Sequence, residues 1–289
     1  MCDIDAVSRP DRDGRAVADV PMLDGIGPVA LADLEEALAA NRIQAHYQPI
    51  VRIADRVPAA VEVLARLAHP ARGMVLPDLF VPQLEEAGLA RKLTASVAES
   101  AFAEWEAGHL VSSGMALALN FPLDVLLTPA ALTALDRQRT QAGIPAGHVI
   151  VELTESRPVT RLGKLGAAVA RLRRAGYCVA IDDVGPGQRD ARDLLALDFS
   201  MLKLDKGFVQ DAMRCPGAAE SLDRTLAGAR AAGMRVVAEG VANAECWAHV
   251  AALGIDFAQG YHVARPMSAA CVREWHRAWT GEPLRAASA

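Results

Sequence analysis

Short apolar runs in this 289-residue chain repeatedly carry acidic, amide or basic side chains near their C-terminal ends. These side chains are Glu62, Asn120, Glu152, Glu155, Asp182, Asp183, Lys203, Asp205, Glu239 and Gln259. Carboxylates that converge on one point cannot all stay ionised without a counter-charge, because like charges raise each other's pKa. A divalent cation is the natural counter-charge, so the sequence predicts a shared metal site.

The types of candidate ligand indicate which metal ion the site would bind. Carboxylates and one amide, with no Cys or His at ligand spacing, favour a hard ion such as Mg²⁺ or Mn²⁺ over zinc. In the adjacent pair Asp182 and Asp183, one side chain can point inward while the next turns out, so the pair can bind two ions about 3.5–4 Å apart. That spacing serves in-line phosphoryl displacement, and Lys203 would add positive charge near the attacking water or the phosphate. The chemistry expected here is therefore metal-assisted cleavage of a phosphodiester.

Each of these residues also has an ordinary alternative role. A single acidic residue after a strand is usually a helix N-cap or a solvated charge. Lys203 alone could equally be a salt-bridge partner. The coincidence across nearly every apolar run favours the shared site over these separate roles.

The apolar runs alternate with helical patterns, which is typical of a mostly parallel α/β sheet. About eight strand–helix units fit a closed (β/α)8 barrel of the TIM type better than an open sheet. All parallel strand ends of such a barrel open on one face, where barrel enzymes place their active sites. Residues 54–58, between the first two strands, are too few for a crossover helix, so we expect one antiparallel strand near the N-terminus.

Side-chain alternation predicts how the strand ends are built. Ala116, Ala118 and Asn120 share one direction, as do Ile150 and Glu152, so the barrel should be apolar inside and polar at its mouth. The apolar runs cover residues 46–51, 60–66, 115–120, 148–155, 177–183, 199–205, 234–240 and 255–260. The helical patterns cover residues 31–43, 89–108, 162–176, 220–233 and 244–254, and most of them end in glycine, as helix C-termini often do.

Composition excludes several classes of protein. The net charge is −5 and no basic stripe is present, so duplex DNA or RNA is not an expected partner. The five cysteines are scattered without a CxxC pair, which favours neither a zinc site nor a disulfide framework. No signal-peptide region and no apolar run of about 18 residues occurs, so we expect a cytoplasmic protein without a membrane segment. The expected organisation is a flexible leader at 1–28, a barrel domain at 29–280 and a tail at 281–289.

Eight short motifs occur in order between about residues 30 and 270. YQPIV at 47–51 is followed by EVLAR at 62–66, and then by LALN, ELTES, AIDDVGPG, LKLD, VVAEGV and AQGY. In this order they resemble the motifs of the EAL-domain cyclic di-GMP phosphodiesterases of bacterial signalling, with EVLAR in the place of the Glu-Ala-Leu that names the family. Any one motif is weak, but the ordered set is specific.

The resemblance implies a barrel with one antiparallel strand that hydrolyses cyclic di-GMP to linear pGpG with Mg²⁺ or Mn²⁺, two ions per site. Water would attack the phosphorus and the ribose 3′-oxygen would leave. The implied partners are cyclic di-GMP and, in addition, a second copy of the chain or a regulatory protein.

The resemblance also assigns roles by motif. Glu62, Asn120, Glu152 and Asp182 resemble ligands of the first metal, and Asp183 resembles a ligand of the second. The same motifs place the remaining residues near the substrate or its supporting loop.

Lys203 resembles the residue that orients the nucleophilic water, and Glu239 one that either completes the metal site or acts as base. Glu155 matches a position that anchors the loop after Asp183. An arginine at position 66 suits a phosphate contact. The positions that resemble substrate-binding or site-supporting residues are Gln48, Leu64, Arg66 and Gln259.

Several positions around the site depart from the family pattern. The segment 182–190 reads DDVGPGQRD where the family usually has Asp-Asp-Phe-Gly-Thr-Gly-Tyr-Ser-Ser, so Pro186 replaces the Thr expected to contact Glu155. Ala242 stands where the family has a second Glu, and Val63 replaces the Ala of the name-giving tripeptide. Altered residues behind metal ligands typically cost about 10–100-fold in metal affinity or activity. The departures therefore predict weak or partner-dependent turnover.

Three functions remain open at this stage. The chain can be an active phosphodiesterase, or a degenerate relative that binds cyclic di-GMP or a protein partner without turnover. The third is another barrel metalloenzyme, which abstracts a proton beside a carboxylate with Lys203 and metal-bound acids.

Overall fold

A computed structural model describes residues 27–108, 110, 114–154, 162–185 and 191–281, and all structural statements concern these residues. The expected leader at 1–28 and tail at 281–289 lie almost wholly outside them. Among the described helices, none is both long and apolar enough to span a membrane.

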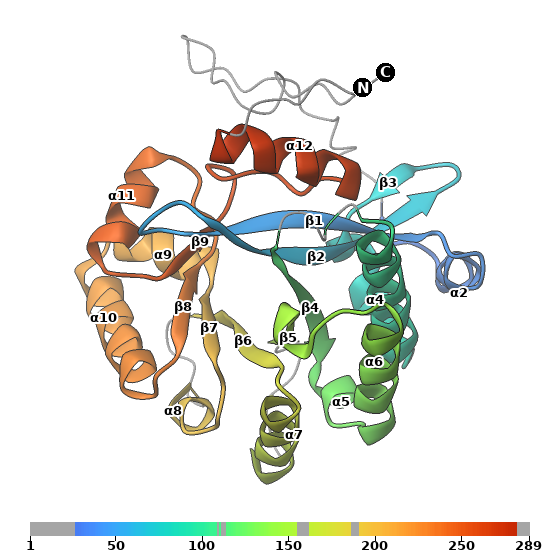
Figure 1. Cartoon of the computed structure of the whole chain (residues 1–289), viewed down its shortest axis with the longest axis horizontal. Coiled ribbons are helices and arrows are strands. Elements are labelled where there is room, and N and C mark those ends of the chain that lie inside the picture. The colour runs from blue at the N-terminus through green and yellow to red at the C-terminus, as the bar shows by residue number, and fades with distance from the viewer. Residues whose placement is uncertain (1–26, 109, 111–113, 155–161, 186–190, 282–289) are drawn as a thin grey trace.

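Eight strands close into a barrel (Figure 1). β1 pairs in antiparallel fashion with both β2 and β9, and all other neighbours around the barrel are parallel. The TIM-like (β/α)8 barrel with one antiparallel strand near the N-terminus is thereby confirmed. The strands are β1 (Ile43–Arg52), β2 (Pro58–His69), β4 (Ala116–Pro122), β5 (Val149–Thr154), β6 (Cys178–Val184), β7 (Met201–Leu204), β8 (Arg235–Ala238) and β9 (Phe257–Gln259).

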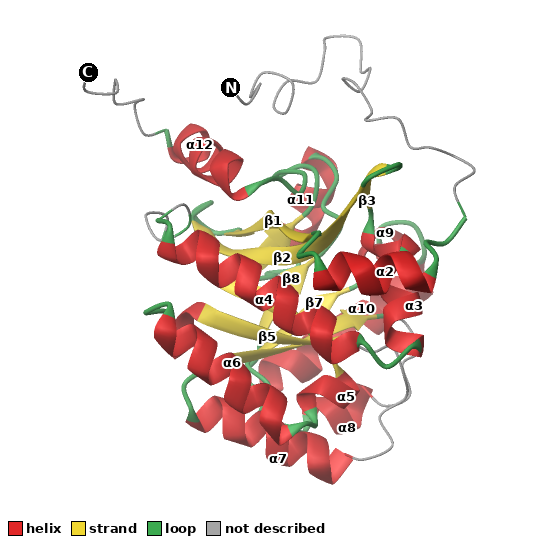
Figure 2. Cartoon of the chain, turned by 90° about the vertical axis from the view of Figure 1, so that its right-hand side faces the viewer, coloured by secondary structure: helices red, strands yellow, loops and turns green. Residues whose placement is uncertain are grey.

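Helices cover the outside of the barrel, and α12 lies along β1 (Figures 1 and 2). The five helical patterns read from the sequence are confirmed by α2, α4, α7, α10 and α11, whereas α3, α5, α6, α8, α9 and α12 were not anticipated. The helices are α2 (Leu31–Ala39), α3 (Val81–Glu86), α4 (Ala90–Glu106), α5 (Leu123–Leu126), α6 (Pro129–Gln141), α7 (Leu162–Arg174), α8 (Ala191–Leu195), α9 (Lys206–Ala212), α10 (Pro216–Ala231), α11 (Ala244–Ala252) and α12 (Ala269–Thr280). A short strand, β3 (Gly73–Val75), extends β2 as a hairpin, and two 3₁₀ turns lie at Pro77–Leu79 and Ala146–His148.

The apolar core has two layers. The larger one lies between the outer face of the barrel and the helices. The smaller one fills the barrel interior and is rich in alanine, which leaves room for the side chains that converge there. Its buried members are Ile50, Ala60, Ala118, Ile150, Ala180, Met201 and Val237. The expected alternation, with Ala118 and Ile150 beneath Asn120 and Glu152, is therefore confirmed.

Gly260, directly after β9, holds the chain against the loop that follows β8. Its φ is +150°, and a Cβ at this position would overlap the backbone N and O of Val241. Val241 also donates its N–H to the Gln259 carbonyl at 3.0 Å, so neither backbone can move away freely. Only glycine fits this close approach.

We expect Gly260→Ala to lower the free energy of unfolding by about 3 kcal/mol, because it combines a disfavoured φ with a backbone overlap. Urea-induced unfolding measures the change. Gly163→Ala is the matched control, since Gly163 is exposed on α7 and nothing lies near its missing Cβ; it should change stability by less than about 1 kcal/mol. Equal effects of the two substitutions would contradict this account.

Candidate metal centre

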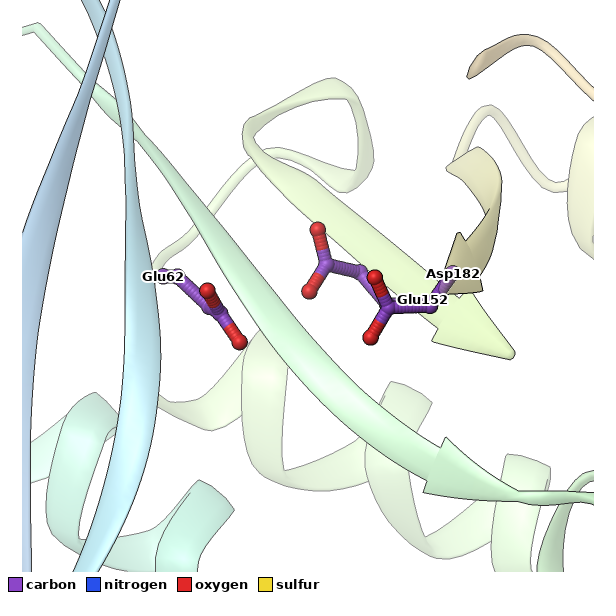
Figure 3. Close-up of side chains that lie close together, drawn as sticks. All are labelled: Glu62, Glu152 and Asp182. Carbon is purple, nitrogen blue, oxygen red and sulfur yellow. The ribbon is translucent and has the colours of Figure 1, made fainter. Parts of the chain in front are cut away.

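Three carboxylates from three strands meet inside the mouth of the barrel. Glu62 on β2, Glu152 on β5 and Asp182 on β6 point toward one another (Figure 3). One oxygen atom from each lies within 4.8 Å of the other two, and all three side chains are buried. Glu152 and Asp182 lie in the C-terminal halves of β5 and β6, and Glu62 lies near the middle of the longer β2. The sequence prediction that these strand ends converge is borne out by this geometry.

Lys203 on β7 lies at the centre of this group and is 1% exposed. Its Nζ is 2.6 Å from Glu239 Oε1, 2.9 Å from Asp182 Oδ1, 3.1 Å from Glu152 Oε2 and 3.5 Å from Glu62 Oε2. Burial by itself would lower the pKa of this ammonium, but the four surrounding carboxylates raise it well above its ordinary value. Lys203 therefore stays positively charged. Its single charge is surrounded by four acidic side chains, so it cannot balance all of them if they are ionised.

Amide side chains hold Glu62 from the other side. Asn120 Nδ2 donates to Glu62 Oε1 at 3.0 Å, and Gln259 Nε2 donates to Glu62 Oε2 at 2.6 Å. Gln259 Nε2 also lies 3.1 Å from Gln48 Oε1, and Gln48 donates to the carbonyl of Ala264 at 3.1 Å. Burial would raise the pKa of Glu62, but Lys203 and these amide donors lower it overall. Glu62 thus stays ionised and oriented.

The pKa of Glu152 moves in the opposite direction, although it shares Lys203 with Glu62. Burial raises the Glu152 pKa well above its usual range; Lys203 opposes this shift, and the neighbouring carboxylates add to it. Among the described residues, Glu152 has no amide donors of the kind that hold Glu62, and Lys203 Nζ donates to it at 3.1 Å. Glu152 is therefore protonated more readily than Glu62.

Asp182, Asp183 and Glu239 form a second group, with one oxygen atom from each within 4.8 Å of the others. Asp183 has a φ of +54°, and the pairing of β6 with β7 is irregular between Ile181 and Val184. This left-handed backbone, uncommon outside glycine and tolerated by Asp, turns two consecutive carboxylates toward the same side. A regular strand would have sent them to opposite faces.

The second group is also protonated more readily than ordinary acids. Burial, followed by the charge of Asp182, raises the pKa of Asp183 to about 6. Burial raises the pKa of Glu239 to about 8; Lys203 opposes this shift and Asp182 contributes to it. Both acids therefore carry protons over part of the neutral pH range.

These donors fit a hard divalent ion. All the charged ligand atoms are carboxylate oxygens, and Asn120 can contribute an amide oxygen. Asp182 Oδ1 and Glu239 Oε1 are buried and accept no hydrogen bond of good geometry, although both lie within ion-pair distance of Nζ. Their lone pairs are thus available to a cation. The two overlapping groups, which share Asp182, can hold one ion or two.

The rim above the site contains further polar side chains. Arg66, 7% exposed, donates through Nη1 to the Ala65 carbonyl at 2.9 Å, and burial lowers its pKa. Leu64 lies opposite His46 across the β1–β2 pair, and burial together with Arg66 lowers the pKa of His46. Arg66, Leu64 and His46 therefore lie near one another on the β1–β2 pair.

Sequence reasoning missed His46, Tyr261 and Arg265 at this rim. Tyr261 is 59% exposed, and the Arg265 guanidinium lies 4.2 Å from its ring centroid. A signal did exist for Tyr261, since a large aromatic residue directly follows the Gln259–Gly260 strand end.

Another acid named from the sequence, Asp205, does not contribute to this centre. Asp205 is the N-cap of α9, where its side chain accepts from the Phe208 N–H at 3.1 Å, so it fills the ordinary role foreseen for such acids. Glu155 lies outside the described residues.

The fold and the site together define a class of protein, a (β/α)8 barrel with a buried carboxylate cluster at the C-terminal ends of its strands. Residues 31–266 match the sequence model of the EAL domain. The chain belongs to the EAL domain family.

Similar proteins are known from Pseudomonas aeruginosa. The cyclic di-GMP phosphodiesterase NbdA is 29% identical over 257 residues, which are 88% of this chain and 33% of NbdA. The cyclic di-GMP phosphodiesterase RocR is 30% identical over 238 residues, 82% of this chain and 61% of RocR. A solved structure of the PaMucR phosphodiesterase in complex with c-di-GMP is 26% identical, with a TM-score of 0.77 over 84% of this chain and 98% of that chain. This chain thus spans about a third of NbdA and about three fifths of RocR.

We expect Lys203→Met to lower the free energy of unfolding by about 3 kcal/mol in chelator at neutral pH, because it leaves the buried carboxylates without their cation. The loss should shrink at about pH 5, where acids with raised pKa values become neutral, and it should also shrink when Mn²⁺ is added. Chemical denaturation measures all three conditions. Lys164→Met, on the exposed face of α7, is the control and should change little. A Lys203→Met protein as stable as the parent in chelator would disprove this electrostatic role.

Binding of Mn²⁺ should tighten as pH rises from about 5.5 to about 8.5, because the ion must displace protons from acids with raised pKa values. The slope should be up to tenfold in association constant per pH unit for each proton displaced. Calorimetry in two buffers of different ionisation enthalpy measures the protons released. Asn tolerates the same left-handed backbone as Asp and cannot titrate. The Asp183→Asn substitution should therefore flatten the dependence of Mn²⁺ affinity on pH near the Asp183 pKa of about 6. Binding that is independent of pH would contradict the raised pKa values.

Proposed function

We propose that this chain binds cyclic di-GMP at the mouth of the barrel and hydrolyses it to linear pGpG, with two Mg²⁺ or Mn²⁺ ions bound. The observation that carries the proposal is the convergence of Glu62, Glu152, Asp182 and Glu239 around Lys203. The names of the relatives NbdA and RocR support the substrate and the reaction.

The residues present suit two ions. Glu62, Asn120, Glu152 and Asp182 would hold the first, while Asp182, Asp183 and Glu239 would hold the second. Bound divalent ions supply Lewis-acid charge beside the phosphate and the attacking water.

The chain's own side chains then position the reactants. Lys203 offers an N–H donor that orients the water, since its Nζ is held rigidly by its ion pairs. Arg66, already buried at the rim, provides a guanidinium for the phosphate. Leu64 supplies an apolar contact at the rim, and Gln48 and Gln259 maintain Glu62 and the floor of the substrate site.

In hydrolysis one proton passes from the attacking water to a base, and the leaving ribose 3′-oxygen takes up one proton from solvent. The oxygen atom of water forms a new bond to phosphorus, and the bond from phosphorus to the ribose 3′-oxygen breaks. Glu239 is placed to accept the proton of the water, since one of its carboxylate oxygens lies within 4.8 Å of oxygens of Asp182 and Asp183. The same residue is also within reach of the second ion, so both of its expected roles are compatible with its place.

A second candidate function is a receptor that binds cyclic di-GMP without turnover. It is favoured by Ala242, which is exposed just before α11 and offers no carboxylate where the family has a Glu. Val184 and Gly185 begin the altered loop, and the substituted positions from Pro186 onward lie outside the described residues. Loss of side chains that support the ligands lowers activity before it removes the ligands themselves.

Purified protein incubated with cyclic di-GMP and Mn²⁺ should release pGpG, and a chelator should stop the reaction. Glu62→Gln and Asp182→Asn should each lower the rate by at least about 100-fold, more than the loss of a supporting residue would. Glu35→Gln, an exposed acid on α2, is the control and should leave the rate unchanged. Chromatographic separation of substrate and product measures turnover.

The outcomes separate the candidates. Tight binding of cyclic di-GMP with no product would reject hydrolysis and leave the receptor. Turnover that survives the chelator would reject the metal role, and the absence of both binding and turnover would reject both functions.

A further inference from the structure

A cavity of about 280 Å³ lies outside the barrel, between α4 and α6. Both helices cover the same side of the barrel, next to β4 and α5 (Figure 1). Its walls are mostly small or apolar side chains from these elements, among them Ala95, Ala98, Ala134, Leu135, Phe121 and Val125. This space is separate from the metal centre, since Phe121 points outward from β4 while its neighbour Asn120 points inward to Glu62.

The space exists because the facing positions of two neighbouring helices carry alanine. Residues at i, i+3, i+4 and i+7 share one side of a helix, and Arg91, Thr94, Ala95 and Ala98 follow that spacing. Protein interiors are normally packed without voids larger than a water molecule. This space is partly open to solvent, and its volume of about 280 Å³ leaves room for a medium-length aliphatic group along the two helices.

Thr94 is a polar side chain without a partner in this apolar wall. It is 9% exposed, and its hydroxyl makes no hydrogen bond to any residue that the structure describes. Other helical threonines, such as Thr133 and Thr225, donate to the carbonyl four residues earlier. The Thr94 oxygen atom is not among the buried atoms left without a partner, so it is open to the cavity and can donate to a ligand there.

The end of the cavity next to Thr94 is positively charged. Arg91 and Lys92 line it, are exposed, and form no ion pair with a described residue. Both lie in the first turn of α4, which contains no acid and whose N-cap, Leu89, offers no side-chain acceptor. Unsatisfied N–H groups at a helix N-terminus add to this positive potential. Ala130 and Ala131, at the start of α6, also line the cavity, so both helices begin at it.

The acidic group nearest along α4 does not cancel this charge. Glu99 lies about two turns further along the helix, and its Oε1 accepts a hydrogen bond of 2.7 Å from Gln138 Nε2. The cavity is thus cationic with a free hydroxyl at one end and apolar through its body.

We propose that this cavity binds a small amphipathic anion, namely a medium-chain aliphatic carboxylate. The alkyl chain lies between the alanine-lined faces of α4 and α6, against Phe121 and Val125. The carboxylate is placed at the N-terminal end of α4, where Arg91, Lys92 and the Thr94 hydroxyl can donate to it. A neutral apolar ligand would leave these donors unused, and a nucleotide would have no polar partners in the body of the cavity.

Titration calorimetry of the full chain with octanoate tests the proposal. We expect one molecule bound per chain with a Kd of about 1 mM or tighter, and weaker binding of octanol, which lacks the charge. The double substitution Arg91→Glu with Lys92→Glu should weaken octanoate about tenfold or more. Lys164→Glu with Arg174→Glu, two exposed cations on α7, changes the net charge equally and should leave binding unchanged.

A second variant fills the cavity. Ala134→Phe should abolish octanoate binding without lowering the unfolding temperature, since its ring occupies space already present. If this protein does not fold, Ala95→Leu replaces it in the same test. Thr94→Val, which keeps the shape and removes the hydroxyl, should weaken octanoate more than octanol.

Three outcomes would overturn the proposal. The first is no binding of octanoate at millimolar concentration, and the second is binding that Ala134→Phe leaves intact. The third is a parent protein that is dimeric in solution and becomes monomeric with Ala134→Phe, which would show that a second copy covers this face. None of these measurements uses a nucleotide or a metal, so their result is independent of the proposed phosphodiesterase activity.

Discussion

The rest of the structure depends on one electrostatic constraint, a single buried ammonium among four carboxylates. Lys203 is 1% exposed and lies within 3.5 Å of oxygen atoms from β2, β5, β6 and the residue after β8. Removing such a group from water is costly, and the cost is recovered only when the opposite charges are close and well ordered. The ammonium therefore ties together strands that are far apart in sequence, and the acids that outnumber it leave a net demand for further positive charge.

The barrel satisfies this constraint through its inner alanines. Ala60, Ala118 and Ala180 fill the layer below the acids with little volume, so the long side chains of Glu62, Glu152 and Lys203 can meet at the axis. Larger residues at these positions would compete with the acids for the same space, since packed interiors tolerate little added volume. The chemistry at the mouth and the packing below it are two consequences of the same alternation along parallel strands.

Much of the barrel and of its cluster of acids could be predicted from the sequence, because the periodicity of each strand and the order of strands along the chain can be read directly from it. The alternation in residues 115–120 and 148–155 fixes which side chains face inward, and a closed barrel then brings them to one face. The distances between side chains on different strands depend instead on the register and stagger of those strands. The contact of Lys203 with four acids at once could therefore not be predicted from the sequence. The opposite pKa shifts of Glu62 and Glu152 could not be predicted for the same reason. The left-handed backbone of Asp183 and the space between α4 and α6 arise from packing between distant segments, which no local pattern encodes.

The residues that depart from the family pattern lie at different places in the fold from the retained ones, and this difference bears on function. The four proposed ligands of the first ion are all on strands, and two of them, Glu62 and Glu152, are paired with neighbouring strands on both sides. Amide and Lys203 contacts hold Glu62 and Asp182 in addition. Of the changed positions that the structure describes, Val184 is the last residue of β6 and Ala242 lies between β8 and α11. In the proposed site the first ion is held by strand residues, whereas Asp183 and Glu239 lie close in sequence to the changed positions. Asp183, at a left-handed φ next to Val184, is the proposed ligand nearest the altered loop, so we expect changes in that loop to lower turnover before they lower affinity for the first ion.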